Sequence, residues 1–315
     1  MKITVLDAAT LGCDISFEKW ESLGELTVYN TTPAIEVVNR LSGSDIAILN
    51  KVKMTAKVIA SLPSLKLICV TATGYDNIDL AACKEKGIAV CNVKGYSTHS
   101  VAQVTITLAL ALMTHLIEYR DCVKNGDYTK SGVQNRLTPI FHELYGKTFG
   151  IVGLGNIGKQ VARVAKAFGC KVLCFKRTPD PDFNCVDLET LLKQSDIVAL
   201  HLPLSDKTKN LIGEKELRLM KKSAILINAA RGAVADEAAV ADAIKSGIIG
   251  GFATDVYSVE PMEENSPLQE IKDFNNVILT PHMAWGAYES RVRCIEEIAE
   301  NITAFLKSEQ RNRVV

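Results

Sequence analysis

Short apolar runs alternate along almost the whole chain with stretches in which apolar residues recur at helical spacing. In the first third of the chain, we expect strands at residues 3–6, 26–29, 46–49, 67–70 and 89–91. The alternation resumes later, where we expect strands at residues 149–152, 172–175, 197–200, 224–227, 250–253 and 277–279. Strands that alternate with helices build βαβ units, and near-continuous apolar strands belong in parallel sheets covered on both faces. The pattern therefore predicts an α/β protein with two doubly wound parallel-sheet domains.

A long uncharged helix is expected between the two sets of strands. It starts with the capping-box pattern Ser100-x-x-Gln103 and runs towards Gly126. Residues 95–117 contain no Asp, Glu, Lys or Arg, but their histidine, glutamine, serine and threonine side chains are too polar to face lipid. We therefore expect this helix to be buried within the protein.

The expected last helix, at residues 289–306, follows the final strand and can pack back against the first domain. We therefore predict one domain formed by residues 1–98 together with 288–315. A second domain, at residues 99–287, would be inserted into it.

The stretch from Lys147 to Arg177 holds the most informative motif, Gly153-Leu-Gly155-Asn-Ile-Gly158. In such a motif the first glycine makes a tight turn, the second lets the backbone approach a pyrophosphate, and the third lets a helix pack closely on a strand. The helix that follows has an apolar face, made of Ile157, Val161, Val164, Ala165 and Phe168. Its N-terminus would offer free N–H groups and a partial positive charge. This order of strand, glycine turn and amphipathic helix predicts a dinucleotide site rather than a βα turn without a ligand.

The end of the next strand bears on which dinucleotide binds. An NAD(H) site usually places an acidic residue there, about 20 residues beyond the glycines, for the ribose 2′-hydroxyl. Here the strand ends in Phe175-Lys176-Arg177-Thr178, and the nearest acids, Asp180 and Asp182, lie past the turn. Two cations and a hydroxyl suit a 2′-phosphate, so we expect NADP(H) to be preferred, with NAD(H) as the alternative. The plainer interpretation of Lys176 and Arg177 is a solvated pair at a strand end.

Arg231, Glu260 and His282 each follow an expected strand of the second domain. The carboxyl ends of parallel strands meet at one sheet edge, where open α/β sheets bind ligands. An arginine can hold a carboxylate through two charge-assisted hydrogen bonds. A histidine can give and take a proton near neutrality, and a nearby carboxylate fixes its tautomer and favours its charged form. The set suits conversion of a 2-oxo acid to a 2-hydroxy acid, although each residue alone could be a solvated or capping group.

In the first domain, a glycine-containing loop follows the expected strand at residues 67–70. It reads Thr71-Ala-Thr73-Gly74-Tyr75-Asp76-Asn-Ile-Asp79, and its backbone N–H groups could face an anion. The alternative is an ordinary βα turn in which the aspartates only cap the next helix.

Composition excludes several other classes of function. Lys plus Arg and Asp plus Glu each number 36, so nothing favours nucleic acid or an anionic membrane as a partner. The nine cysteines form no C-x-x-C pair, which argues against a disulfide framework and a structural zinc site. We expect no metal, a location in the reducing cytoplasm, and a first strand rather than a signal peptide at the N-terminus.

Ordered motifs along nearly the whole chain resemble those of the D-isomer-specific 2-hydroxyacid dehydrogenase family. They are Ala72-Thr-Gly-Tyr-Asp-Asn-Ile-Asp79, Gly153-Leu-Gly-Asn-Ile-Gly158, His201-Leu-Pro-Leu204, Asn228-Ala-Ala-Arg-Gly232, Asp255-x4-Glu260-Pro261 and Thr280-Pro-His282. The glycerate dehydrogenase and hydroxypyruvate or glyoxylate reductase branch is the most similar. This resemblance implies a Rossmann cofactor domain inserted into a flavodoxin-like substrate domain. It also implies reduction of a small 2-oxo acid to the D-2-hydroxy acid, with glyoxylate or hydroxypyruvate ahead of pyruvate.

The resemblance implies a role for each matching position. His282 would protonate the carbonyl oxygen as general acid, Glu260 would orient His282, and Arg231 would bind the substrate's carboxylate and carbonyl. Backbone N–H groups at Thr73 and Gly74 would hold the other side of the carboxylate, and Tyr75 would also belong to the substrate site. Asp255 would receive the nicotinamide carboxamide. The other cofactor contacts would come from Gly153, Gly155, Asn156, Ile157, Lys176, Arg177, Thr178, His201, Pro203, Thr208, Ala229 and Ala230.

The resemblance further implies a homodimer, to which the segment after Tyr119 contributes. An alternative function on the same fold is a nucleotide-sensing, corepressor-like binding protein, but that role leaves Arg231, Glu260 and His282 unexplained. An L-specific dehydrogenase would share the cofactor and reaction but would normally place its dinucleotide fold first.

Overall fold

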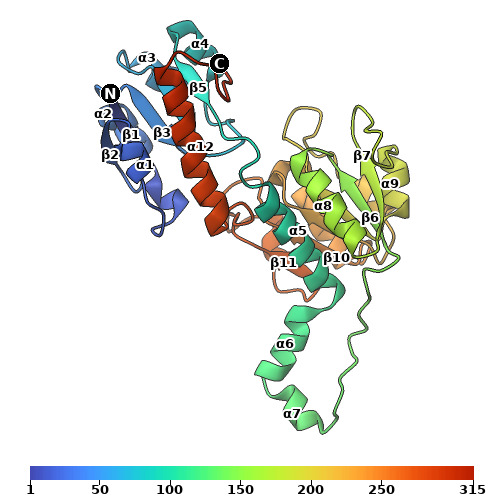
Figure 1. The fold of residues 1–315 in the computed structure, drawn as a ribbon. Helices are drawn as coiled ribbons and strands as arrows, with labels where there is room; N and C mark the ends of the chain where they lie inside the picture. Colours follow the sequence, from blue (N-terminus) through green and yellow to red (C-terminus); the bar gives the residue numbers. More distant parts are fainter. The chain divides into compact units, whose positions relative to one another are not determined.

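The computed structural model describes residues 1–315, which form two compact units. Unit 1 consists of Met1–Ser97 and Gly286–Val315, and unit 2 of Thr98–Trp285. Each unit contains one parallel sheet with helices packed on it, which confirms the predicted α/β fold with two parallel-sheet domains (Figure 1).

Unit 1 has a five-stranded parallel sheet in the order β2-β1-β3-β4-β5. This is the strand order of flavodoxin-like folds. The strands are β1 (Lys2–Val5), β2 (Glu25–Val28), β3 (Ile46–Leu49), β4 (Leu67–Val70) and β5 (Ala89–Cys91). The apolar runs predicted β3, β4 and β5 to the residue, because these three strands are wholly buried, and predicted β1 and β2 within one residue.

Helices cover both faces of this sheet. One face carries a core with Leu49, Ile68 and Val70, under α2 (Val37–Arg40), α3 (Ala56–Ala60) and α4 (Leu80–Lys86). On the other face, α12 (Tyr288–Leu306) packs against β4 and against α1 (Glu18–Glu21), where the buried Trp20 indole donates to Ile295 O at 3.0 Å. Both chain termini lie in this unit (Figure 1).

Unit 2 has a six-stranded parallel sheet in the order β11-β10-β9-β8-β6-β7. Its strands are β6 (Thr148–Val152), β7 (Lys171–Phe175), β8 (Ile197–Leu200), β9 (Ile225–Asn228), β10 (Gly251–Thr254) and β11 (Val277–Leu279). The chain runs from β6 to β7 on one side and then to β8 on the other side of β6. The order of strands reverses at this point, so the ligand crevice of such a sheet is expected beyond the ends of β6 and β8.

Alternate strand residues of unit 2 enter two separate cores, because successive side chains of a strand point to opposite faces. Ile151 packs with α5 (Thr98–Met113) and α8 (Asn156–Ala167). Val152 packs with the helices of the other face, α9 (Leu188–Gln194), α10 (Glu214–Leu219) and α11 (Glu237–Lys245). Double coverage explains why these strands read as continuous apolar runs rather than alternating ones.

Three predictions about the helices were wrong. The helix expected from Ser100 begins at Thr98, so Ser100 is not its N-cap and instead donates to Ala284 O at 2.5 Å. The same helix breaks at His115, which has a φ of 50°, and continues as α6 (Leu116–Lys124) and α7 (Asp127–Ser131). Phe168, expected on the apolar face of α8, follows the helix and is 42% exposed. No residue type near His115 signals the left-handed turn, whereas Gly169, which has a φ of 77° and directly follows Phe168, does mark the end of α8.

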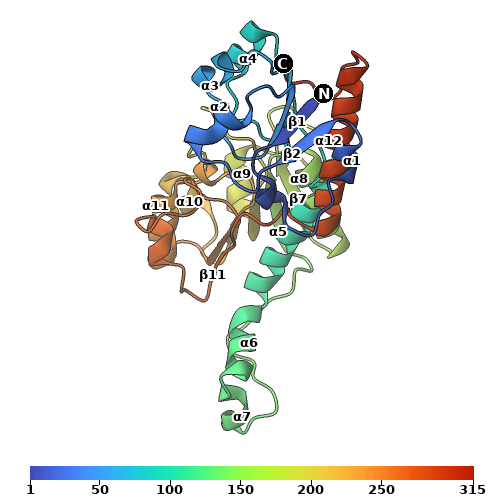
Figure 2. The same ribbon diagram turned by 90° about the vertical axis from the view of Figure 1, so that its left-hand side faces the viewer.

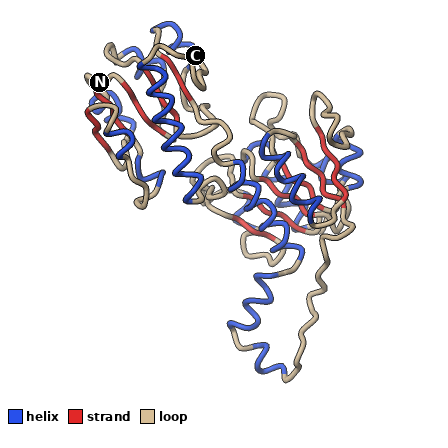
Figure 3. Tube along the Cα trace, in the orientation of Figure 1, coloured by secondary structure: helices blue, strands red, loops and turns tan.

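Residues 116–147, here called the arm, extend away from the sheet of unit 2 (Figures 1 and 2). Helices α6 and α7 lead outward, and an irregular segment returns to β6 (Figure 3). Tyr119 ties the two together, since its hydroxyl donates to Pro139 O at 2.6 Å and its ring meets Phe141 edge-on. No single helix of the chain is long and apolar enough to cross a membrane, and only the bent pair α5 and α6 reaches the necessary length and composition jointly.

Candidate active site

The glycine turn after β6 has the geometry of a dinucleotide site. Gly153 has a φ of 103°, and a Cβ there would lie 2.5 Å from His201 O. A Cβ at Gly158 would lie 2.2 Å from Gly153 O, so α8 can approach β6 only with glycine at this position. Gly155 differs, because a Cβ there would meet nothing within 4 Å. The open space beside exposed Gly155 and Asn156, at the N-terminus of α8, fits the close approach of a pyrophosphate.

The segment after β7 carries the predicted 2′-phosphate contacts. Asp180 is 8% exposed, and its carboxylate pairs with Lys159 of α8 at 2.7 Å and with Lys176 at 3.7 Å. The hydrogen bond from Lys159 is the main reason why the pKa of Asp180 is lowered. Arg177 and Thr178 are exposed beside this cluster. Asp180, the acid nearest to the end of β7, is thus already paired with two lysines of unit 2.

The loop after β8 brings His201, Pro203 and Thr208 to the same crevice. The Thr208 hydroxyl donates to Pro203 O at 2.7 Å and accepts from Ser205 N at 2.8 Å, which closes the loop on itself. Both ring nitrogens of His201 are buried without a hydrogen-bond partner. Burial lowers the pKa of His201 to about 4, so this imidazole is neutral near pH 7.

Asn228, at the end of β9, holds the turn that carries Ala229, Ala230 and Arg231. Its buried side chain donates to Arg231 O at 3.0 Å and accepts from the Ala230 N–H at 3.1 Å. The next residue, Gly232, lies so close to the following strand's loop that a Cβ would be 1.9 Å from the Tyr257 carbonyl carbon. The absence of a side chain at Gly232 therefore brings the Arg231 turn against the segment that leads to Glu260.

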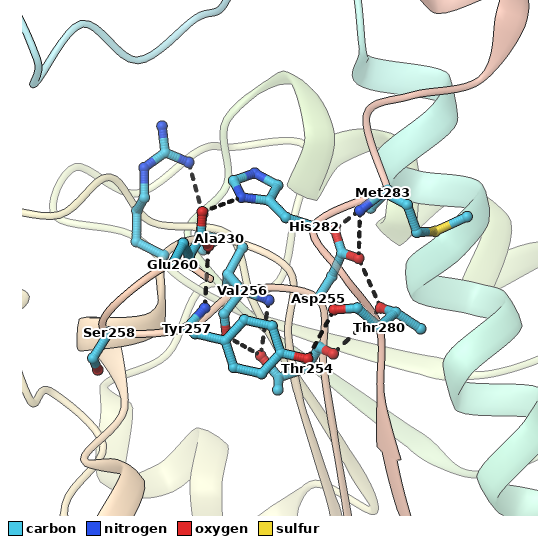
Figure 4. A network of polar contacts seen from close by, with 12 residues as sticks. Ala230, Thr254, Asp255, Val256, Tyr257, Ser258, Glu260, Thr280, His282 and Met283 are labelled. Carbon is cyan, nitrogen blue, oxygen red and sulfur yellow. Dashed lines mark hydrogen bonds and ion pairs between the residues drawn. The ribbon is translucent and has the colours of Figure 1, made fainter. Parts of the chain in front are cut away.

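His282 and Glu260, which come from different strand ends, form a direct pair. His282 Nδ1 lies 2.6 Å from Glu260 Oε2, and their side chains are 23% and 30% exposed (Figure 4). The Tyr257 N–H donates to the other carboxylate oxygen of Glu260 at 3.2 Å. His282 has a φ of 53°, an uncommon conformation for a residue with a side chain. Because Nδ1 is engaged by Glu260, Nε2 is the ring atom that can exchange a proton with a ligand.

Asp255 anchors the loop that carries His282. Its carboxylate is 1% exposed and accepts from Thr280 Oγ1 at 2.7 Å, Met283 N at 2.9 Å and Ala284 N at 2.8 Å (Figure 4). These contacts lie on both sides of His282 in the sequence. The structure thus gives Asp255 a positioning function in addition to the carboxamide contact that the family resemblance implies.

Tyr257, which follows β10, also holds the loop that carries His282. Its hydroxyl donates to Thr280 O at 2.9 Å, and burial, followed by the nearby carboxylates, raises its pKa to about 12. Asn228, Tyr257 and Thr280 were not among the predicted site residues. Their signal in the sequence was a polar side chain directly at or after the end of an apolar strand.

Unit 1 holds the remaining predicted substrate residues at the carboxyl end of β4. The Thr73 hydroxyl donates to Val93 O at 2.8 Å, whereas neither the Thr73 nor the Gly74 N–H donates a hydrogen bond within the chain. Tyr75 packs against the core of unit 1. Asp79 caps α4 by accepting from Ala82 N at 3.0 Å. This aspartate therefore has the helix-capping role that was the alternative to an anion-binding loop.

A Rossmann sheet with a glycine turn, together with a histidine–carboxylate pair at the ends of its strands, is typical of a nicotinamide-dependent oxidoreductase. More narrowly, the chain belongs to the D-isomer specific 2-hydroxyacid dehydrogenase family. The sequence model of that family's NAD binding domain matches residues 106–284.

Relatives across the full length agree with this assignment. The chain is 40% identical to a glycerate dehydrogenase of Methylorubrum extorquens, over 99% of this chain and 98% of the relative. It is 36% identical to a hydroxypyruvate reductase of Blautia hydrogenotrophica, over 100% and 99%. The protein is therefore a D-2-hydroxyacid dehydrogenase of the branch expected from its motifs, and the corepressor-like alternative is not favoured.

Solved structures resemble the whole chain as well. An acyclic imino acid reductase in complex with NADPH and D-Arg has a TM-score of 0.89 and 32% identity, with all of both chains covered. A D-lactate dehydrogenase of Aquifex aeolicus, complexed with NAD and lactic acid, has a TM-score of 0.85 and 32% identity, over 98% of this chain and 96% of the other. Both bear a nicotinamide dinucleotide, which agrees with the cofactor class predicted from Gly153, Gly155 and Gly158.

Proposed function

We propose that this enzyme reduces glyoxylate or hydroxypyruvate, and next pyruvate, to the D-2-hydroxy acid with NADPH as the preferred reductant. The observation that supports the reaction is the 2.6 Å contact between His282 Nδ1 and Glu260 Oε2 beside the Arg231 turn. It leaves one imidazole nitrogen, Nε2, to deliver a proton.

Each group has a defined role in the reduction. His282 Nε2 donates a proton to the carbonyl oxygen of the substrate, and Glu260 orients the ring and stabilises its charged form before the transfer. The Arg231 guanidinium binds the carboxylate and the carbonyl, and the N–H groups of Thr73 and Gly74 bind the other side of the carboxylate, next to Tyr75. The bound nicotinamide supplies the hydride that becomes attached to the carbonyl carbon.

The cofactor would be held along the edge of unit 2. The N–H groups at Gly155, Asn156 and Ile157 would hold the pyrophosphate, next to the turn that Gly153 makes. Asp255 would receive the carboxamide of the nicotinamide. The loops at the ends of β8 and β9 supply the rest of the contacts, from His201, Pro203, Thr208, Ala229 and Ala230.

The substrate is proposed to carry one carboxylate and a small side chain. No second cation occurs between Thr73 and Tyr75 to bind a distal carboxylate. The names of the relatives, glycerate dehydrogenase and hydroxypyruvate reductase, point to the same substrate class.

The preference for NADPH is supported by the surroundings of Asp180. Lys159 and Lys176 neutralise this carboxylate, and Arg177 and Thr178 are exposed next to it. A 2′-phosphate would therefore meet cations and a hydroxyl rather than an unpaired acid. Relatives of known structure bind NADPH in one case and NAD in another, so the preference rests on these residues.

The test is a panel of 2-oxo acids assayed with NADPH and NADH, followed by chiral analysis of the products. We expect the highest kcat/KM for glyoxylate or hydroxypyruvate with NADPH, and D-glycerate from hydroxypyruvate. Arg177→Ala should lower kcat/KM for NADPH by about 10-fold or more, as expected for a lost charge-assisted hydrogen bond. A preference for NADH that Arg177→Ala leaves unaltered would overturn the cofactor assignment, and no turnover of any 2-oxo acid would overturn the function.

We further propose a homodimer that forms through the arm, and a cytoplasmic location. The arm exposes apolar side chains that a second copy could cover, among them Leu137 at 71% and Ile140 at 73%. Nine cysteines without a disulfide suit a reducing compartment.

A further inference from the structure

We propose that Asn92 is a positioning residue for substrate binding, because its buried side-chain amide turns the Gly74 N–H outward to receive the substrate carboxylate. The inference rests on the proposed function, in which the Thr73 and Gly74 amides bind that carboxylate. It adds a residue that lies behind the binding loop and does not itself contact the ligand.

Asn92 lies directly after β5 and is 2% exposed. Its Nδ2 donates to Thr73 O at 2.7 Å. Thr73 in turn donates its hydroxyl to Val93 O at 2.8 Å, and the Val93 N–H donates to Ala72 O at 3.0 Å. Three hydrogen bonds therefore fasten the loop after β4 to the end of β5 on the side where the two strands are neighbours.

The direction of the Gly74 N–H follows from the geometry of the peptide bond. The bond between Thr73 and Gly74 is trans, since the cis bonds of the chain lie elsewhere. In a trans peptide the C=O and the next N–H point in opposite directions. Because the Thr73 carbonyl points at Asn92, the Gly74 N–H must point away from β5. That N–H makes no bond within the chain, and a backbone donor requires a partner.

Asn92 is itself held from behind by two further asparagines. Asn301 of α12 is 1% exposed and donates to Asn92 O at 3.0 Å. Asn312 donates to Asn301 Oδ1 at 3.0 Å, and the Asn92 N–H donates to Asn312 O at 3.3 Å. The chain's last residues continue this support, because they pair antiparallel with β5 at Cys91 and Arg313. A row of amides thus runs from residue 312 to the substrate loop.

The side chain of Asn92 is not arranged for stability alone. Its Oδ1 is buried and has no hydrogen-bond partner, which costs stability in any folded protein. Only the Nδ2 group of the amide forms a hydrogen bond, and its acceptor is the Thr73 carbonyl. A loop fixed in its binding conformation loses little entropy when the ligand arrives, which is how such an arrangement raises affinity.

The test exchanges the donor for an acceptor of the same size. In Asn92→Asp, a carboxylate would face the Thr73 carbonyl and no bond could form. We expect KM for the preferred 2-oxo acid to rise by about 10- to 100-fold, the loss typical of a hydrogen bond to a charged group. The ratio of kcat/KM for the 2-oxo acid to that for its methyl ester should fall in the same variant. The Kd of NADPH, measured by fluorescence, should stay within about 2-fold of the wild-type value.

Thr4→Val is the matched control. Thr4 and Ser44 form a buried side-chain hydrogen bond of 2.7 Å in the same unit, and Ser44 precedes β3, at the sheet edge opposite to Thr73. This variant should lower Tm without changing KM or the preference for the acid over the ester. Asn92→Ser, which is neutral but too short to reach Thr73, serves as a second variant of the same contact.

One measurement needs no variant. Hydrogen exchange of the Gly74 amide in the wild-type enzyme with NADPH should slow when oxamate, a carboxylate analogue of a 2-oxo acid, is added. Unchanged KM and ester preference in folded Asn92 variants would overturn the inference while leaving the proposed function intact. Unchanged Gly74 exchange would overturn the inference together with the proposed Gly74 contact, but not the reduction of a 2-oxo acid. If the wild-type enzyme reduced no 2-oxo acid at all, the proposed function would fail first and this inference with it.

Discussion

His282 Nδ1 lies 2.6 Å from Glu260 Oε2, although 22 residues separate the two in the chain. Asp255 and Tyr257 hold the histidine loop, and the Tyr257 N–H holds the other oxygen of Glu260. The loop backbone around His282 and the Nδ1 atom of its imidazole are thus both held before any ligand binds. Preorganisation of this kind lets a general acid act without first being reoriented.

Glu260→Gln tests the pair, because the amide has the same size but no charge to orient and stabilise a protonated imidazole. We expect kcat to fall by about 10²-fold in Glu260→Gln. In His282→Ala it should fall by about 10²–10⁴-fold, the range typical of a lost general acid. Equilibrium binding of NADPH, followed by fluorescence, should change little in both. Equal losses in turnover and in NADPH affinity would show that the pair only maintains the fold.

Lys159→Met tests the origin of the cofactor preference. Without the contact at 2.7 Å, the Asp180 carboxylate would retain only Lys176 and would repel a 2′-phosphate. The ratio of kcat/KM for NADPH to that for NADH should fall by about 10-fold, equivalent to about 1.4 kcal/mol. Asp180→Asn in the same chain should reverse this fall.

Lys166→Met is the control for that experiment. Lys166 also lies on α8 and places its ammonium group 5.0 Å from the Phe183 ring, but it has no ion pair with Asp180. Its removal should leave the cofactor ratio unchanged. An equal effect of both substitutions would trace the preference to overall charge rather than to the contact with Asp180.

Leu137→Asp combined with Ile140→Asp tests the arm as a dimer interface. Both side chains are more than two-thirds exposed, at 71% and 73%, and a charge buried in an interface without a partner is strongly unfavourable. Light scattering after gel filtration should give the mass of a dimer for the wild type and of a monomer for the variant. Ile35→Asp, at an apolar residue of unit 1 that is 88% exposed, should leave the mass unchanged. A wild-type monomer would contradict the prediction.

His201 makes stability depend on pH. Its pKa is lowered to about 4 by burial, from 6.5, so the folded protein keeps the ring neutral where the unfolded chain would bind a proton. The contribution of His201 to the free energy of unfolding is fully present above pH 6.5. It is lost as the pH falls towards 4, and the loss is at most about 3 kcal/mol. His201→Gln should flatten this slope in urea titrations at pH 4.5 and 7. The exposed His99→Gln should not, and equal slopes in all three proteins would refute the assignment.

The local features of the protein followed from its sequence. Buried parallel strands require unbroken apolar runs, and this pattern located all eleven strands to within one residue, including the largely exposed edge strand β2. The glycine turn was equally predictable, because positive φ at Gly153 and the close approach at Gly158 leave no other residue type possible. The break at His115 was missed, since a left-handed histidine has no distinctive pattern around it.

The identity of the reactive residues was also contained in the sequence, but their partners were decided by the tertiary structure. The motifs placed Arg231, Glu260 and His282 at strand ends. Which carboxylate meets which cation depends on loop conformation and rotamer, as the capture of Asp180 by Lys159 illustrates. The bond from Asn92 to Thr73 likewise joins residues 19 apart through the pairing of β4 with β5. Sequence periodicity reports which side of an element is buried, whereas hydrogen bonds between distant loops exist only once the strands have been brought side by side.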